Sequence, residues 1–160
     1  MDENERPMTP LHPGQVWVLR IRAAFAALFP IAAFVILERS LPPDLGIPPG
    51  LITGLVVLLA LAALVILPRR RWRAWGYCEE EDELHIRHGL LVRYRTVVPF
   101  GRVQHIDVAQ GPVERRFGVA TLVLHTAGTR ASAVALPGLP PDEAERMRDR
   151  IRAKIRQELA

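Results

Sequence analysis

A run of seventeen residues without a single charge, LITGLVVLLALAALVIL at 51–67, most constrains how this chain can fold. As a helix it would extend over roughly 25 Å at 1.5 Å per residue, slightly less than the hydrocarbon core of a bilayer, and flanking residues can cover the remainder. A buried helix of a soluble protein is the alternative, but few such helices carry so long an uncharged run. The run therefore predicts a transmembrane helix.

A second apolar block, AAFAALFPIAAFVIL at 23–37, lies before the first. Extended back to Val16 it would reach about 33 Å, and Arg20 and Arg22 near its start have side chains long enough to reach the headgroups. Pro30 is expected to kink this helix. The preceding segment is too long for a signal peptide, and no small-x-small cleavage site follows. We therefore expect an N-terminal tail at 1–15 and a transmembrane hairpin at 16–67, with spans at 16–37 and 51–67.

Arginines set the expected orientation of this hairpin. They precede the first span and follow the second as RRRWR at 69–73, whereas the connector at 38–50 carries only Arg39, offset by Glu38 and Asp44. The positive-inside rule then places both termini in the cytoplasm of a multi-pass protein of the bacterial cytoplasmic (inner) membrane. The net charge of +4 comes largely from arginines beside apolar segments, so we expect the membrane as a partner and no nucleic acid. The single cysteine, Cys78, excludes an intramolecular disulfide.

The second half of the chain has the pattern of short antiparallel strands. Alternating or β-rich segments at intervals of about ten residues predict six strands, at 75–80, 84–89, 90–100, 102–110, 119–126 and 131–137, with a hairpin turn at 127–130. Pro112 and Gly118 frame a short helix. Five apolar residues at helical spacing predict a final amphipathic helix: Ala144, Met147, Ile151, Ile155 and Leu159. The sequence thus predicts an α+β domain at 74–160.

The stretch RVQHIDVAQGPVERRFGVATLVLHTAGT at 102–129, together with ALPGL before the last helix and the two spans, resembles the bacterial pleckstrin-homology (PH) membrane proteins of the YdbS-like group. The resemblance covers nearly the whole chain from Val16. It implies a two-helix transmembrane hairpin followed by a cytoplasmic PH-like antiparallel β-sandwich or partly open barrel with a C-terminal α-helix. The family supplies no established enzymatic activity and no agreed ligand.

The polar stretch at 102–118 invites a catalytic interpretation. In a strand His105 and Asp107 would stand adjacent on one side, and such a pair can orient a general base. However, no nucleophile motif accompanies the pair, and the histidines lack the spacing of metal ligands. We therefore predict no enzymatic activity, no catalytic or metal-binding residues and no cofactor. Gln104, His105 and Asp107 are expected to form a structural polar network, with a protein contact as a compatible alternative.

Two further residue sets are candidate contacts. In the short helix, Glu114, Arg115 and Arg116 are expected to face outward toward a partner, while Phe117 packs inward and matters most for folding. A basic face toward anionic headgroups is expected from four residues of the second and third strands: His85, Arg87, Arg93 and Arg95.

The expected function is therefore that of a membrane-anchored interaction or scaffold module. Its partner would be another membrane protein, possibly with repeated PH-like domains, or a second copy of the chain. The alternative is a sensor of anionic lipid headgroups at the inner membrane surface. The acidic turn at 79–83 departs from the basic first hairpin that is typical of phosphoinositide-binding PH domains.

Overall fold

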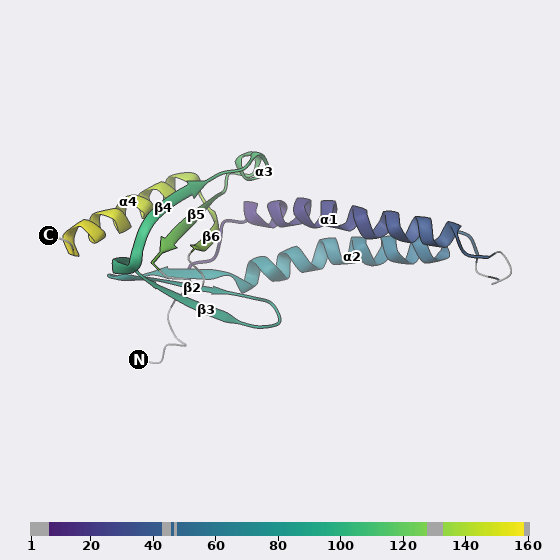
Figure 1. The fold of residues 1–160 in the computed structure, drawn as a ribbon, viewed down its shortest axis with the longest axis horizontal. Coiled ribbons are helices and arrows are strands. Elements are labelled where there is room, and N and C mark those ends of the chain that lie inside the picture. The colour runs from purple at the N-terminus through teal and green to yellow at the C-terminus, as the bar shows by residue number, and fades with distance from the viewer. Residues whose placement is uncertain (1–6, 43–45, 47, 128–132, 159–160) are drawn as a thin grey trace. The chain divides into compact units, whose positions relative to one another are not determined.

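Two long apolar helices and a domain of two small sheets make up the computed structural model (Figure 1). It describes residues 7–42, 46, 48–127 and 133–158. The predicted hairpin turn at 127–130 lies, apart from Ala127, outside these residues, as does Leu159 of the predicted apolar helix face. The chain divides into two units, the helical hairpin at 16–69 and a domain formed by the residues before and after it.

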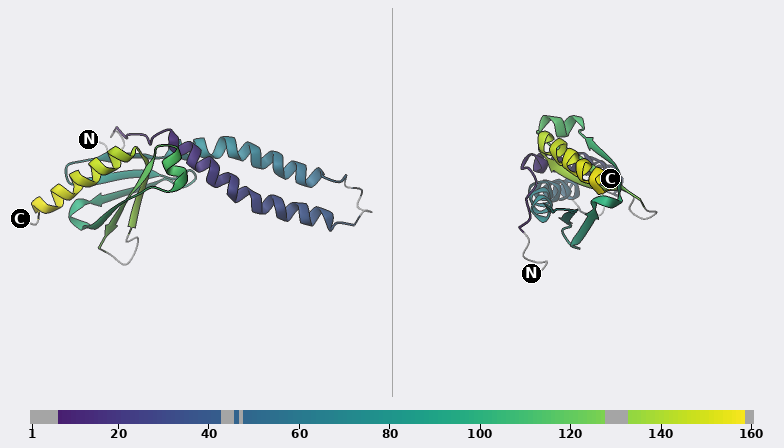
Figure 2. Two further views of the ribbon diagram at one scale, coloured as in Figure 1. Left: turned by 90° about the horizontal axis from the view of Figure 1, so that it is seen from above. Right: turned by 90° about the vertical axis from the view of Figure 1, so that its left-hand side faces the viewer.

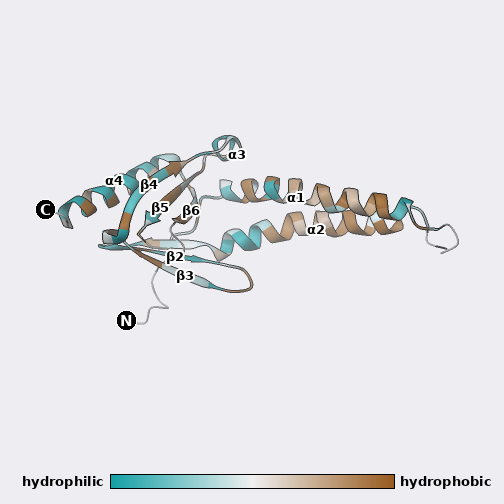
Figure 3. Cartoon of the chain, viewed as in Figure 1, coloured by the Kyte–Doolittle hydropathy of each residue, from teal (hydrophilic) through white to brown (hydrophobic). Residues whose placement is uncertain are grey.

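The helical hairpin consists of α1 (Gly14–Arg39) and α2 (Leu51–Ala74). Both helices are long and apolar enough to cross a membrane, and their middle portions are hydrophobic all round (Figure 3). The Glu38 carboxylate at the end of α1 accepts hydrogen bonds from the backbone N–H groups of Ile52 and Thr53, at 3.1 Å each. These donors lie in the first turn of α2 and have no partner within the helix, so Glu38 joins the two helices at the connector.

The domain contains two three-stranded antiparallel sheets and confirms the predicted α+β class. The first sheet has β1 (Gly76–Glu79), β2 (Glu83–His88) and β3 (Tyr94–Pro99) in sequential order. The short η2 (Phe100–Arg102) leads into the second sheet of β4 (Val103–Ala109), β5 (Ala120–Thr126) and β6 (Ala133–Leu139). The helix α3 (Pro112–Arg116) joins β4 to β5, and α4 (Pro141–Glu158) follows β6 (Figure 2).

The core lies between the two sheets and α4 and is built from alternate strand residues. Leu84 and Ile86 of β2, Leu122 and Leu124 of β5, and the buried face of α4 are almost completely excluded from water. Each such side chain contributes roughly 1.5–3 kcal/mol relative to an exposed position. As predicted, Ala144, Met147 and Ile151 form the buried stripe of α4. The predicted PH-like fold is confirmed, with open sheets rather than a closed barrel.

The third strand is shorter than predicted. It begins at Tyr94 rather than at 90, because Gly89 adopts a positive φ of 106° and turns the chain at the end of β2. A side chain on Gly89 would also overlap the carbonyl oxygen of Val92. Residues 90–93 therefore form the connection of the β2–β3 hairpin and not part of a strand.

The predicted N-terminal tail belongs to the domain in its described part, 7–15. Thr9 and Tyr77 form a β-bridge with N–H to carbonyl distances of 2.7 and 3.0 Å, and the Trp72 indole donates to the Leu11 carbonyl at 3.0 Å. The His12 N–H donates to the Gly138 carbonyl at 2.8 Å. Leu11 is only 2% exposed. The domain thus has two separate stretches of sequence, with the hairpin inserted between them.

Candidate functional site

A basic hollow of about 490 Å³ lies where the end of α2 meets the β2–β3 hairpin. Among the described residues, eight line it and five of these are arginines. The described lining is Arg70, Arg73 and Ala74 of α2 and Arg87, Gly89, Leu90, Arg93 and Arg95 of the hairpin. The predicted basic residues Arg87, Arg93 and Arg95 are therefore brought together by the fold.

Local structure explains why these arginines converge. Arg87 of β2 and Arg95 of β3 are direct partners in the antiparallel register, so their side chains emerge on the same face of the sheet. Arg93 lies in the hairpin connection, two residues before Arg95. Arg70 and Arg73 are three positions apart on α2 and therefore share a helix face. The sequence indicated Arg70 and Arg73 only as determinants of membrane orientation; the convergence depends on tertiary structure.

The hollow is strongly positive. A guanidinium group remains protonated at all physiological pH values. Within the described part of the chain, Arg70, Arg73, Arg87 and Arg93 make no ion pair with a carboxylate. Several guanidinium groups in a shallow cavity form a site for an anion, and their paired N–H donors match the oxygens of a phosphate.

His85 does not belong to this basic face, contrary to expectation. It is only 8% exposed, and its Nε2 lies 2.6 Å from Glu83 Oε1 and 3.6 Å from Glu80 Oε2. These carboxylates come from the acidic turn at the opposite end of β2 from the arginines. The three side chains place ligand atoms within 4.8 Å of one another, a grouping that the sequence analysis did not predict. The His85–Glu83 hydrogen bond is sufficient to explain their proximity.

A stack of three rings supports the hairpin beside the hollow. Trp75 directly follows α2, and its ring centroid lies 4.8 Å from that of His88 in β2. The His88 ring is in turn 5.3 Å from Tyr94 in β3. The interplanar angles of 23° and 21° are those of stacked rings. The hairpin is thus tied to the chain segment that leaves α2.

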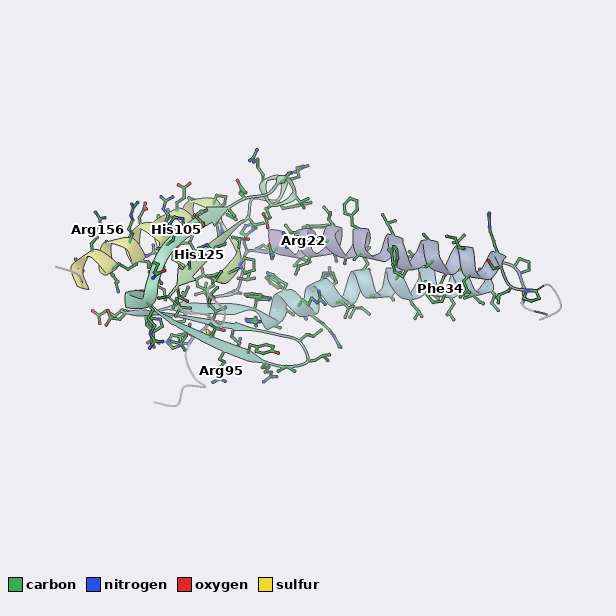
Figure 4. The ribbon with its side chains drawn as sticks, in the orientation of Figure 1. Arg22, Phe34, Arg95, His105, His125 and Arg156 are labelled. Carbon is green, nitrogen blue, oxygen red and sulfur yellow. The ribbon has the colours of Figure 1, made fainter. Side chains whose placement is uncertain are left out.

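The polar stretch around His105 forms an exposed cluster on the second sheet. Asp107 Oδ1 lies 2.8 Å from His105 Nε2, and Asp107 Oδ2 lies 3.2 Å from His125 Nε2. The rings of His105 and His125 are neighbours, with centroids 5.8 Å apart (Figure 4). His105 and Asp107 are adjacent as predicted, and the partner that the sequence did not identify is His125, the register neighbour of His105 on β5. All three side chains are more than 40% exposed. A bulge between Val103 and His105 interrupts the alternation of faces: Val103 is buried, whereas Gln104 and His105 are both exposed.

The helix α3 differs from prediction in one respect. Arg115 and Arg116 are exposed, but Glu114 is only 8% exposed and does not face outward. Its carboxylate accepts a hydrogen bond from the Gly111 N–H at 2.6 Å, which satisfies an N–H group at the start of the helix. Phe117 is half-buried; the fully buried phenylalanine of the domain is Phe100.

A second basic groove of about 410 Å³ runs between β4 and α4. Three arginines four residues apart on α4 line it, together with residues of β4. The described residues that line it are Val103, Gln104, His105, Ile106, Arg148, Arg152, Ile155 and Arg156. In the sequence, the arginines belong to the polar face of the predicted amphipathic helix.

The model of the bacterial PH domain family matches residues 24–155. The chain belongs to this family. The bacterial PH domain has curated relatives among membrane proteins of Bacillus subtilis (strain 168). The UPF0699 transmembrane protein YdbS is 36% identical over 102 residues, covering 64% of this chain and 62% of the relative. The UPF0699 transmembrane protein YdbT is 30% identical over 105 residues, covering 65% of this chain and 20% of the relative.

The matched part of the chain thus spans about three fifths of the first relative and one fifth of the second. No solved structure matches the chain. The family and the two apolar helices establish a membrane-associated bacterial PH domain protein, as the resemblance of the sequence implied.

Proposed function

We propose that this membrane-anchored PH domain has no catalytic activity and that its basic hollow binds anionic lipid headgroups at the surface of its own membrane. The convergence of five arginines from α2 and the β2–β3 hairpin carries this proposal. A lipid phosphate offers the oxygens that guanidinium groups bind best. Each basic residue close to an anionic membrane surface contributes about 1 kcal/mol of binding free energy.

The short separation in sequence between the end of the apolar run and the hollow supports a lipid as the source of the anion. Arg70 follows Leu67, the last residue of the uncharged run, by three positions in one continuous helix. Three residues of helix correspond to a rise of about 4.5 Å. The hollow therefore begins where the chain leaves the hydrocarbon, at the depth of the headgroups.

We further propose that the protein is multi-pass in the bacterial cytoplasmic membrane, with both termini in the cytoplasm. The distribution of arginines favours this orientation. The bonds that join 7–15 to the rest of the domain support an even number of crossings, because His12 and Gly138 must share one compartment. In this orientation the hollow would face the anionic lipids of the cytoplasmic leaflet.

The test uses the full chain in neutral detergent micelles. Its thermal unfolding is followed on addition of short-chain phosphatidylglycerol, phosphatidylcholine or inorganic phosphate. We expect selective stabilisation by phosphatidylglycerol and a loss of affinity of about 30-fold in the Arg87→Gln/Arg93→Gln variant, at roughly 1 kcal/mol per arginine. The Arg115→Gln/Arg116→Gln variant removes the same charge elsewhere and should respond like the wild type.

Equal stabilisation by phosphatidylcholine would contradict the headgroup proposal, as would an unchanged response of the Arg87→Gln/Arg93→Gln variant. If inorganic phosphate at the same concentration stabilised as strongly as phosphatidylglycerol, the ligand would be free phosphate rather than lipid.

Protein binding through α3 is the second candidate function. Arg115 and Arg116 are exposed on a short helix that the buried Glu114 carboxylate holds in place. The partner would be another membrane protein, possibly with repeated PH-like domains, or a second copy of this chain. Crosslinking and recovery from native membranes should then fail for the Arg115→Gln/Arg116→Gln variant and succeed for the Arg87→Gln/Arg93→Gln variant. The same two variants thus separate the two functions.

A further inference from the structure

The tip of the β2–β3 hairpin exposes three consecutive apolar side chains. Leu90, Leu91 and Val92, here called the hairpin tip, are 40%, 96% and 59% exposed. The sequence predicted a strand at these positions, in which alternate residues would have been buried. In the structure Leu91 contributes almost nothing to the core. Exposing its apolar surface to water costs free energy, and transfer to an apolar environment would remove this cost.

The hairpin tip is held in a defined conformation. Gly89 turns the chain with a positive φ that other residues rarely adopt. The stack of Trp75, His88 and Tyr94 fixes the base of the hairpin. The exposed leucines are therefore presented by ordered structure.

Basic residues surround the hairpin tip on the side of the hollow. Leu90 shares the hollow with Arg70 and Arg73, and Arg93 directly follows Val92. An apolar projection with adjacent arginines and an aromatic ring, Tyr94, is the composition of segments that lie in a membrane interface. Arginine stems can lie along apolar surface while their guanidinium groups reach the phosphates.

We infer that the hairpin tip enters the interfacial layer of the bilayer, with Leu91 inserted below the headgroup phosphates that the surrounding arginines bind. The inference rests on the proposed headgroup function and adds a point of insertion besides the two spans. The short sequence distance from Leu67 to Arg70 and Arg73 keeps this part of the domain at the membrane surface. Three side chains also offer far less area than the roughly 800 Å² per partner of a standard protein interface, so a bilayer fits the patch better than a second protein does.

The experiment places a fluorescent probe at the hairpin tip of the full chain in lipid nanodiscs, in which both faces of the bilayer are accessible. In a Cys78→Ala background, Leu91→Cys is labelled with an environment-sensitive dye. Ala153→Cys, an exposed position on α4, is the matched control. Each probe is tested with iodide in the water and with spin-labelled lipids, in phosphatidylcholine alone and with phosphatidylglycerol added.

We expect the probe at 91 to emit at shorter wavelength, to resist iodide and to be quenched by lipids labelled near the headgroup, whereas the probe at 153 shows the reverse. Equal iodide quenching at both positions would overturn the inference. Shielding from iodide without quenching by the lipids would also overturn it, because protein would then cover the hairpin tip.

The two experiments have separable outcomes. Insertion of the probe at 91 together with an unchanged lipid response of the Arg87→Gln/Arg93→Gln variant would support insertion of Leu91 and refute phosphate binding by the arginines. A water-exposed probe together with selective phosphatidylglycerol binding would refute insertion alone.

Discussion

Arg87 and Arg95 lie directly opposite each other across β2 and β3, so two positive charges occupy one cross-strand pair. Like charges in this position destabilise a sheet by roughly 0.2–1 kcal/mol. Arg87→Gln should therefore raise the stability of the full chain in neutral detergent at low salt, and the gain should shrink as salt screens the repulsion. Thermal unfolding at two ionic strengths measures this. Arg93→Gln, which has no cross-strand partner, is the control and should change stability less.

The burial of Phe100 and Phe117 predicts which phenylalanine substitution lowers the stability of the domain more. Phe100 is 0% exposed and lies in the core, so Phe100→Ala should cost about 3–5 kcal/mol, comparable to the whole stability of a small domain. Phe117→Ala should cost less, because Phe117 is half-buried. Denaturant unfolding of the domain within the full chain compares them, with Phe100→Leu as a milder variant. A larger loss for Phe117→Ala would show that α3 packs more tightly than the structure indicates.

Arg150 links α4 to the first sheet and should make part of the stability depend on pH. It bonds Glu79 Oε2 at 2.6 Å and Glu143 Oε1 at 2.8 Å. The Arg150 hydrogen bond, with help from Arg146, holds the pKa of Glu143 below its ordinary value. Because the pKa is lower in the folded state, this carboxylate stabilises the fold fully above its unfolded-state pKa. The contribution is lost as the pH falls through the folded-state pKa.

Arg150→Ala should accordingly destabilise the domain by about 1 kcal/mol or less at neutral pH, since the side chains are partly exposed. The difference from the wild type should disappear in acid. Unfolding midpoints between neutral pH and pH values below about 4.5 test this, the ordinary carboxyl pKa being 4.5. Arg156→Ala, on the same helix and without an ion pair among the described residues, should show no such pH dependence; a parallel loss in both variants would mean that helix propensity, not the ion pair, is responsible.

The orientation of the hairpin is testable with compartment-specific reporters. A fusion after Leu41 in the connector should report the outside of the cytoplasmic membrane, and a fusion at the C-terminus should report the cytoplasm. Signals from the same compartment, or an exported C-terminus, would contradict the proposed two-span topology.

The sequence predicted the elements that have a long apolar run or a clear periodicity. The uncharged run at 51–67 is long enough to indicate a helix. The apolar stripe of α4 and the alternation in β2 and β5 appear where expected, because a helix and a strand impose different periods on the buried residues. The apolar residues at 90–92 were wrongly predicted as strand, since a short apolar run does not reveal whether it is buried or projects from a hairpin. The sequence around Val103 likewise gave no indication of the bulge in β4.

Only some of the arginines of the basic hollow could be predicted as a site from the sequence. Arg87, Arg93 and Arg95 are close in sequence and were predicted as one face, whereas Arg70 and Arg73 join them only because the last turn of α2 lines the same hollow as the hairpin. His85 alternates correctly with Arg87 but is taken out of the basic face by Glu83. Nothing in the local pattern near Leu11 signalled that the N-terminal segment completes the domain.

The position of that segment has a consequence for biosynthesis. The ribosome makes Leu11 and His12 before either span, and the carbonyl of Gly138 that His12 binds is made only after five of the six strands. The N-terminal segment therefore cannot make its bond to β6 until the last strand has been synthesised. Closure of the domain around it is a late event in synthesis, and in the proposed two-span topology it requires both ends of the hairpin to lie on the same side of the membrane.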